Sequence, residues 1–240
     1  MKRLFTLLIF AAALAAPRLA AADGFDERCH AAMAPYYAAL LTSARRDTEG
    51  TLRHLVVLHA RWSNLQRVAV ADWPRWATQP SGAGSLVETI ASKIDGARLK
   101  TTGRDIVGAH AELESIRALL RDARARVGAR TFDDAVTDYH EAMERLTGRT
   151  GLHNEIALNA DDYAAIQEQV ARAAAAWAEI QSAAGAAKSA SGWPGLSGAT
   201  EKALGLLRSA TSARDMGATQ TAAEALKARY FELLAILARA

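Results

Sequence analysis

The chain has 240 residues, 50% of them hydrophobic, and carries 29 Lys and Arg against 26 Asp and Glu, a formal net charge of +3. Its single cysteine, Cys29, excludes an intramolecular disulfide, and it has no C-x-x-C-H motif for covalent haem attachment. Strand-forming runs are nearly missing, and Ala, Leu, Arg and Glu dominate, which indicates an all-α fold.

The first residues have the pattern of a secretory signal peptide. Lys2 and Arg3 precede an apolar run at 4–16, and small residues then suit a signal peptidase. We expect cleavage after Ala22 and a periplasmic mature chain, with no later run apolar enough for a membrane helix. Because Arg18 leaves with the other two basic residues, the mature chain is near neutral. Its charge therefore does not indicate a nucleic-acid partner.

Eight helices are predicted, in chain order, at 26–43, 47–70, 85–99, 104–127, 133–146, 161–183, 196–212 and 215–238. Breaker-rich linkers at 73–84, 128–131, 148–154 and 188–195 separate several of them. The fourth helix has an apolar seam at alternating steps of three and four, formed by Ile106, Ala109, Leu113, Ile116, Leu120, Ala123 and Val127. The last helix has a second seam, formed by Met216, Thr219, Ala223, Leu226, Tyr230, Leu233 and Leu237.

Several short patterns recur in the same order, which favours two copies of four helices. The matches are His30 and Met33 with His140 and Met143, Trp62 with Trp177, Arg98 with Arg208, and Arg104-Asp105 with Arg214-Asp215. The alternative is a single helical array whose helices share an amphipathic pattern.

Short loops between neighbouring helices favour antiparallel packing. We therefore predict an all-α fold of two tandem up-down-up-down four-helix bundles. The signal peptide occupies 1–22, the first bundle 23–130 and the second 131–240. Trp62 and Trp177 should fill equivalent core positions.

Three histidines of the first copy, His54, His59 and His110, correspond to Gln169, Ala174 and Gln220 in the second. In an up-down-up-down bundle His54 or His59 would approach His110, with Glu112 or Glu114 nearby. Imidazoles with a carboxylate suit zinc or copper. The alternative is structural, because His59 shares an apolar stripe with Leu52, Leu55, Val56 and Trp62 and would then be a core histidine.

The two His-x-x-Met pairs place an imidazole and a thioether on one helix face. The first pair follows a thiol, which gives Cys29, His30 and Met33, and the second is His140 with Met143. Soft sulfur with imidazole is a copper-type ligand set. The alternative is that the sulfur side chains fill gaps in the core.

Catalytic signatures such as G-x-S-x-G, a P-loop or H-E-x-x-H do not occur, so we expect no enzymatic activity. The acidic pairs at 133–134 and 161–162 stand at predicted helix starts, where carboxylates act as caps. Trp73 and Trp76 in the 73–84 linker would form a partner-binding patch if they were exposed. Alternatively, they fold back and cover the end of a bundle.

The segment MGATQTAAEALK at 216–227 resembles the last helix of the exported four-helix-bundle cytochromes, the soluble b-type and c-prime class. The resemblance implies a periplasmic bundle that holds haem between its first and last helices, with Met33 or Met143 as one ligand. The family's histidine would fall near Leu234 or Arg124, neither of which is a haem ligand. The resemblance therefore supports the fold and argues against a haem site of that kind.

These patterns predict an exported, non-enzymatic binding or accessory protein whose ligand is a transition metal, copper first, or haem. The alternative is a ligandless interaction module, such as a sensor-like adaptor that uses the surface of its helices. The partners expected are a periplasmic protein or a second copy of the chain, with nucleic acid excluded.

Overall fold

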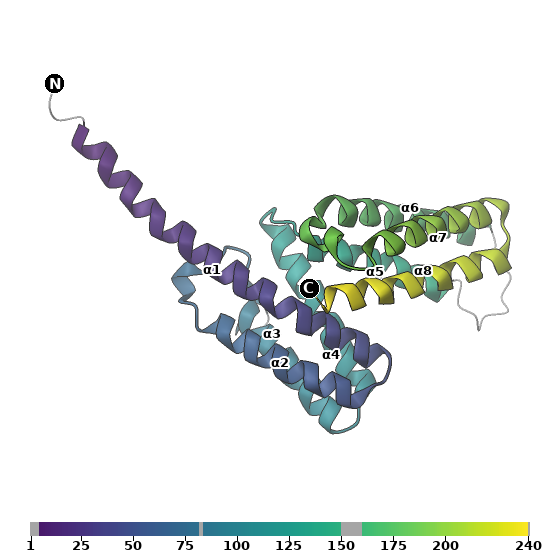
Figure 1. Cartoon of the computed structure of the whole chain (residues 1–240), viewed down its shortest axis with the longest axis horizontal. Helices are drawn as coiled ribbons and strands as arrows, with labels where there is room; N and C mark the ends of the chain where they lie inside the picture. Colours follow the sequence, from purple (N-terminus) through teal and green to yellow (C-terminus); the bar gives the residue numbers. More distant parts are fainter. Residues whose placement is uncertain (1–4, 82–83, 150–159, 240) are drawn as a thin grey trace. The chain divides into compact units, whose positions relative to one another are not determined.

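In the computed structural model the chain is all-α, as predicted, and its helices pack in antiparallel pairs consistent with helical bundles (Figure 1). The structure describes residues 5–81, 84–149 and 160–239, with side chains from Gly24 onward except at 149, 160, 161 and 186. The predicted signal peptide at 1–22 therefore lies outside the described side chains. Within the described residues, no helix is both long and apolar enough to cross a bilayer.

Eight helices span the described residues: α1 (Phe5–Ala44), α2 (Thr48–Gln66), α3 (Leu86–Thr102), α4 (Ile106–Arg126), α5 (Phe132–Arg149), α6 (Ala160–Ala183), α7 (Trp193–Ala213) and α8 (Met216–Leu237). Short 3-10 turns lie at η1 (Val70–Asp72) and η2 (Gly185–Ser189). The linker before α3 also contains a two-residue antiparallel ribbon, β1 (Pro80–Ser81) with β2 (Gly84–Ser85), which the sequence did not predict.

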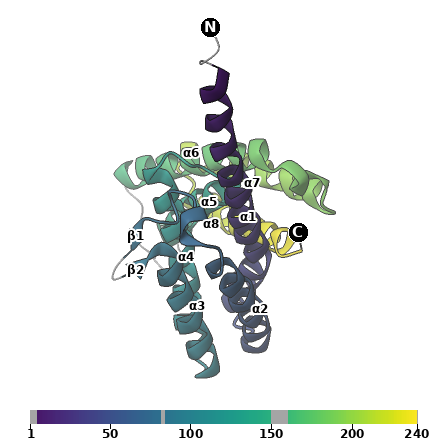
Figure 2. The same ribbon diagram turned by 90° about the vertical axis from the view of Figure 1, so that its left-hand side faces the viewer.

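The chain divides into two compact units, Met1–Ala129 and Arg130–Ala240. In the first unit α1 and α3 each pack on both α2 and α4, so every helix has two neighbours. Figure 2 shows α1 beside α2 and α3 beside α4. In the second unit α5 and α7 likewise each pack on α6 and α8.

The core of the first unit is built from one apolar face of each helix. The predicted seam of α4 is confirmed, because Ala109, Leu113, Ile116, Leu120 and Ala123 are all buried, and only the end positions Ile106 and Val127 are half-exposed. Two aromatic side chains link helices through hydrogen bonds. Tyr36 of α1 donates to the carbonyl of Leu113 at 2.9 Å, and Trp62 Nε1 donates to the carbonyl of Val87 at 2.9 Å.

The core of the second unit contains a cluster of aromatic side chains from all four of its helices. Trp177 of α6 stacks on Trp193 of α7, with ring centroids 6.2 Å apart, and packs at 5.6 Å on Tyr139 of α5. Tyr230 of α8 completes the cluster at 6.3 Å from Tyr139. The Tyr139 hydroxyl and the Trp177 indole N–H are buried without a hydrogen-bond partner among the described residues. The first unit, by contrast, pairs the polar groups of Tyr36 and Trp62.

Three tight turns share one local structure, in which an arginine in the left-handed conformation precedes an aspartate that caps the next helix. The arginines are Arg46, Arg104 and Arg214, with φ of 58°, 64° and 55°. The aspartates that follow accept a hydrogen bond from the third residue of α2, α4 and α8, and are Asp47, Asp105 and Asp215. Left-handed backbone ends one helix, and the carboxylate satisfies a free N–H of the next. These turns set the antiparallel pairing.

Candidate functional site

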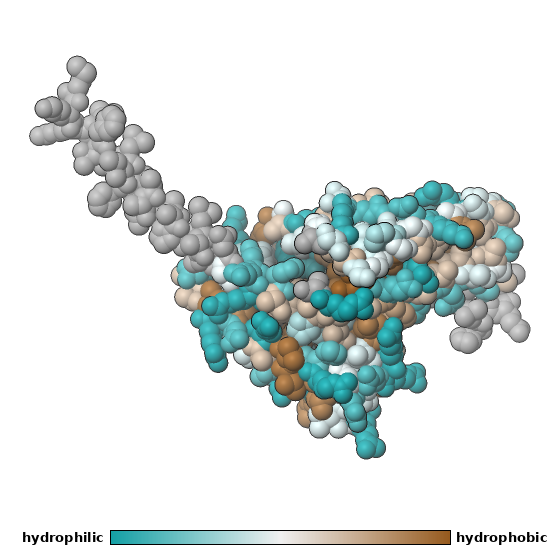
Figure 3. Space-filling model, viewed as in Figure 1, coloured by the Kyte–Doolittle hydropathy of each residue, from teal (hydrophilic) through white to brown (hydrophobic). Residues whose placement is uncertain are grey.

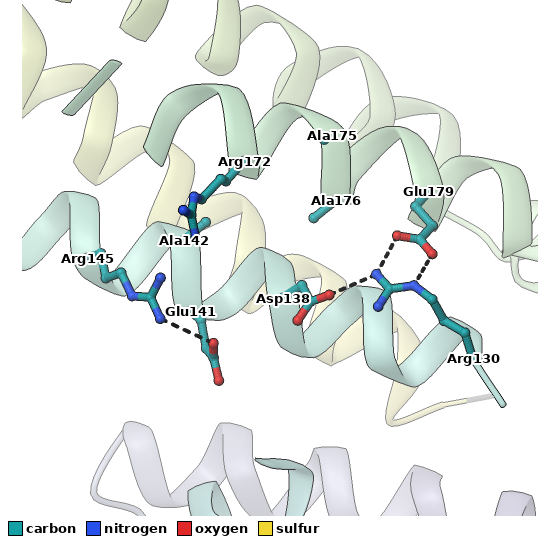
Figure 4. Close-up of a pocket in the computed structure, with 9 residues that line it drawn as sticks. All are labelled: Arg130, Asp138, Glu141, Ala142, Arg145, Arg172, Ala175, Ala176 and Glu179. Atoms are coloured by element: carbon teal, nitrogen blue, oxygen red, sulfur yellow. Dashed lines mark hydrogen bonds and ion pairs between the residues drawn. The ribbon is translucent and has the colours of Figure 1, made fainter. Parts of the chain in front are cut away.

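The second unit has an open groove of about 340 Å³ between α5 and α6 (Figure 4). Its lining consists of three arginines, three acids and three alanines: Arg130, Arg145, Arg172, Asp138, Glu141, Glu179, Ala142, Ala175 and Ala176. The small alanine side chains leave a depression where the two helices meet. The longer charged side chains rise along both rims, and Figure 3 shows how widely hydrophilic residues cover the surface in that view.

At one end of the groove, Arg130 holds together the start of α5 and the end of α6. Its guanidinium donates to Glu179 through Nε and Nη2, and Nη2 lies 2.8 Å from Asp138 Oδ2. The hydrogen bonds with Glu179 are the main reason why the pKa of Arg130 is raised, and the same bonds lower the pKa of Glu179. The Arg130 and Glu179 side chains are therefore both ionised at neutral pH.

At the other end, two arginines lie across the groove from one another. Arg145 of α5 is 51% exposed, and its Nη2 lies 3.5 Å from Glu141. Arg172 of α6 is 56% exposed and pairs with Glu168 one turn earlier, with Nε 3.1 Å from Oε1. Because exposed pairs on one helix are worth only about 0.3–0.5 kcal/mol, both guanidiniums can exchange these carboxylates for external ones.

The lining suits recognition of a charged partner. Guanidinium groups bind carboxylates and phosphates through paired hydrogen bonds. None of the nine lining residues is a serine, threonine, cysteine or histidine, and their ionisable side chains are all carboxylates or guanidiniums. We did not predict this groove from the sequence. The available signal was a pair of opposite charges seven residues apart on each helix, Asp138 with Arg145 and Arg172 with Glu179.

Cys29, His30 and Met33 have different environments on α1. Cys29 and Met33 are buried in the core, at 3% and 5% exposure, whereas His30 is exposed. Arg124 Nη2 lies 3.9 Å from Cys29 Sγ, so the positively charged group beside the thiol is a guanidinium. Core packing thus accounts for both sulfur side chains.

His140 and Met143 are also separated by their packing. Met143 is 1% exposed in the core of the second unit. The His140 ring packs on Tyr230 at 4.7 Å between centroids, and its Nε2 lies 3.7 Å from Glu144 Oε1. Lys227 Nζ lies 3.4 Å from the same carboxylate oxygen. The Glu144 carboxylate is therefore shared between the imidazole of His140 and the ammonium group of Lys227.

The three histidines of the first unit have different partners. His59 Nε2 lies 3.4 Å from Asp95 of α3, whereas His110 Nδ1 lies 2.8 Å from Ser43 Oγ of α1 and its Nε2 lies 3.3 Å from Glu114. The pKa of His54 is lowered, first by burial and then by Arg53. No group of three or more His, Cys, Asp or Glu side chains arranged to hold a metal ion occurs in the part of the chain that the structure describes.

The interpretation of His59 as a core histidine is wrong. Its side chain is 42% exposed, and Leu52 and Val56 of the same predicted stripe are 36% and 51% exposed. The core face of α2 is formed by Leu55, Leu58, Trp62 and Leu65 instead. Leu52 and Val56 therefore belong to a second apolar face of α2, which the other helices of the first unit leave exposed.

Trp73 and Trp76 fold back onto the end of the first unit. Trp76 is 6% exposed, and its ring packs edge-on against Phe25 at 5.5 Å and beneath the Arg124 guanidinium at 4.8 Å. Trp73 is half-buried, packs on Phe25 at 5.8 Å and donates from Nε1 to the carbonyl of Val68 at 2.8 Å. Both indoles therefore cover the end of the bundle, as expected if the linker folds back onto it and does not form an exposed partner-binding patch.

The haem arrangement of the resembled cytochromes does not fit the residues present. Met33 borders an apolar void of only about 10 Å³, whereas ligand sites enclose about 300–1,000 Å³. The positions that would carry the family's histidine hold Leu234 and Arg124, both buried. Arg124 is moreover committed to Trp76 and Cys29.

Comparison of the chain with protein-family models, with curated proteins and with solved structures found no match.

Proposed function

We propose that the chain is an exported, non-enzymatic interaction module that binds its partner at the outer surface of its helices. One contrast carries this proposal. The void beside Met33 holds about 10 Å³, which is only the lower limit of the volume that one water needs, whereas the groove between α5 and α6 offers about 340 Å³ of charged, solvent-facing space. This contrast favours the adaptor alternative over a ligand held in a bundle core.

We also propose that each unit is an up-down-up-down four-helix bundle and that the two arose by duplication. The ring of helix contacts in each unit supports the topology, since α1 meets α4 and α5 meets α8. The turn that joins α3 to α4 and the turn that joins α7 to α8 have the same arginine and aspartate, 110 residues apart. A duplicated scaffold leaves the second copy free to diverge at its surface.

Chemical cross-linking in the periplasm, followed by mass spectrometry of the purified chain, tests this function. The proposal predicts cross-links from surface side chains to another protein chain. A matched control is an unrelated exported helical protein carrying the same tag. Recovery of the chain with no specific cross-linked protein, at an abundance where the control is equally clean, would contradict the proposal.

A transition-metal role, copper first, is the second candidate. The observation that favours it is the pairing of imidazole with carboxylate one turn apart, at His110 with Glu114 and at His140 with Glu144. Two such ligands bind copper or zinc weakly unless other groups complete the site. Equilibrium dialysis against Cu(II) and Zn(II) would detect stoichiometric uptake. Uptake that His110→Ala or His140→Ala removes would favour this candidate.

A further inference from the structure

We propose that the outer face of α2 is a self-complementary surface through which two copies of this chain associate with their α2 helices antiparallel. The outer face has an apolar middle and one charge near each end. The middle is formed by Leu52, Val56, Val57 and Ala60, and the ends by Glu49 and the capping residue Arg67. Figure 3 shows apolar side chains gathered over α2 in that view.

The apolar middle lies on the side of α2 away from the core of the first unit. Val56 and Val57 are 51% and 46% exposed, and Leu52 is 36% exposed. Leu52, Val56 and Ala60 follow one another at steps of four residues, so they form one strip along the helix. Water therefore contacts a continuous apolar surface, and covering that surface with another apolar surface is favourable.

Glu49 and Arg67 point to the same side of α2 from its opposite ends. Arg67 keeps helical backbone angles, with φ of −80° and ψ of −10°. From residue 49 to residue 67 is a separation of 18 residues, which makes about five complete turns and about 27 Å. Both side chains are exposed, and neither forms an ion pair with another residue that the structure describes. Each charge is therefore open to a counter-charge from another chain.

The charged ends and the apolar middle share one centre. Position 58 is midway between Glu49 and Arg67, and it is also midway between Val56 and Ala60. A two-fold axis that lies in the plane of contact, perpendicular to α2 at this position, brings the outer faces of two copies together. Glu49 of each copy then lies opposite Arg67 of the other, and Val56 lies opposite Ala60.

This arrangement is compatible with helix packing. The small side chain of Ala60 lets the two helices approach closely, and at a crossing angle of about 20° long side chains about 13 Å from the centre still meet. Arg53, a further charge of this face, lies opposite Ser63 and so does not directly oppose another cation. A second copy supplies both counter-charges at the spacing that the face requires, which is why we assign it as the occupant.

The apolar middle supplies most of the affinity, because exposed ion pairs mainly fix register and direction. Contact between one pair of helices makes a small interface, so the dimer should be weak and reversible. This inference does not depend on the proposed function, because it concerns a different surface and a different occupant.

Sedimentation velocity of the purified chain tests the inference. The wild type should show a dimer whose population rises with concentration. Val56→Gln with Val57→Gln keeps the net charge and should weaken the dimer by on the order of a hundredfold, because the apolar contact is lost in both copies. The matched control is Leu206→Gln, which changes a 53% exposed apolar residue of α7 and should leave the dimer unchanged.

Charge reversal tests the antiparallel orientation. Glu49→Arg makes both ends basic and Arg67→Glu makes both ends acidic, so each variant alone should associate about tenfold more weakly. An equimolar mixture of the two, or one chain carrying both changes, should regain the wild-type affinity. Arg208→Glu and Glu224→Arg make the same changes of charge at exposed positions of the second unit and should have no effect. Circular dichroism melting establishes that each variant is folded.

Three results would overturn the inference. The first is a wild type that sediments as a monomer up to about 1 mM. The second is a dimer that Val56→Gln with Val57→Gln does not weaken. The third is a failure of the two folded charge variants to associate when mixed. None of these results bears on the proposed function, because binding of a different protein is measured separately by cross-linking in the periplasm.

Discussion

The buried tyrosines of the two units should respond in opposite directions to removal of their hydroxyl groups. Tyr36 is 2% exposed and donates to the Leu113 carbonyl at 2.9 Å, so Tyr36→Phe loses a net contribution of about 1 kcal/mol. Tyr139 is fully buried, and its hydroxyl has no hydrogen-bond partner among the described residues. Burial raises the pKa of this phenol, which keeps it protonated. Removing an unsatisfied buried hydroxyl should stabilise the second unit by about 1–3 kcal/mol.

The expected difference between the two variants is thus at least about 2 kcal/mol, which exceeds the error of a well-controlled denaturation experiment. Urea unfolding followed by far-UV circular dichroism measures it. Because the chain has two compact units, each change in stability should be measured from the unfolding transition of the unit that carries the substitution. The tryptophans provide an independent pair. Trp62→Phe should cost about 1 kcal/mol more than Trp177→Phe, since only Trp62 donates a hydrogen bond to a described residue.

Equal losses for Tyr36→Phe and Tyr139→Phe would refute this reasoning. They would mean that the Tyr139 hydroxyl has a partner, such as a buried water, and that its burial carries no penalty. A stabilised Tyr139→Phe variant would instead identify the second unit's core as the less optimised of the two.

Three further predictions concern the turns and the pH dependence of stability. Arg104→Gly should stabilise the chain by about 1 kcal/mol in urea unfolding, because only glycine adopts φ of 64° without cost; a loss of stability would mean that the arginine side chain contributes more than its backbone costs. Gly108→Ala should destabilise by about 1 kcal/mol, measured in the same way, because a Cβ there would lie 2.1 Å from Asp105 Oδ2 and displace the cap. Hydrogen bonds from Lys100 and then Lys93 lower the pKa of Glu112, so its contribution is present above its ordinary value of 4.5 and is lost as pH falls through the lowered value. The free energy of unfolding of Glu112→Gln should therefore change less between neutral and acidic pH than that of the wild type. Identical pH profiles for the two proteins would contradict this.

Periodicity predicted the helices well, because burial of one face leaves a repeat of three and four residues in the sequence. The α4 seam is the clearest example, with Ala109, Leu113 and Leu120 all buried. Periodicity could not choose between two apolar faces on α2. Leu52 and Val56 match the repeat as well as Leu55 and Trp62 do, and only contact with α1 and α3 decides which face is covered.

The groove was harder to predict because it depends on which charges two different helices bring together. When α5 is considered alone, Asp138 and Arg145 are typical of an ordinary solvent-exposed helix face. Their arrangement becomes informative only when α6, running antiparallel, places Glu179 and Arg172 opposite them. Similarly, Trp76 could not be assigned to the end of the bundle until the linker was seen to return to Phe25.

Native mass spectrometry of the chain purified from the periplasm is the most direct test of the claim that this protein binds a partner at its surface and holds no ligand in a core. One spectrum reports signal cleavage, bound metal or haem, and any associated protein chain. We predict the mass of a chain that begins at Asp23, without stoichiometric metal or haem, accompanied by a complex with another protein chain. A lone chain that carries one haem, or one metal ion per molecule, would contradict the claim.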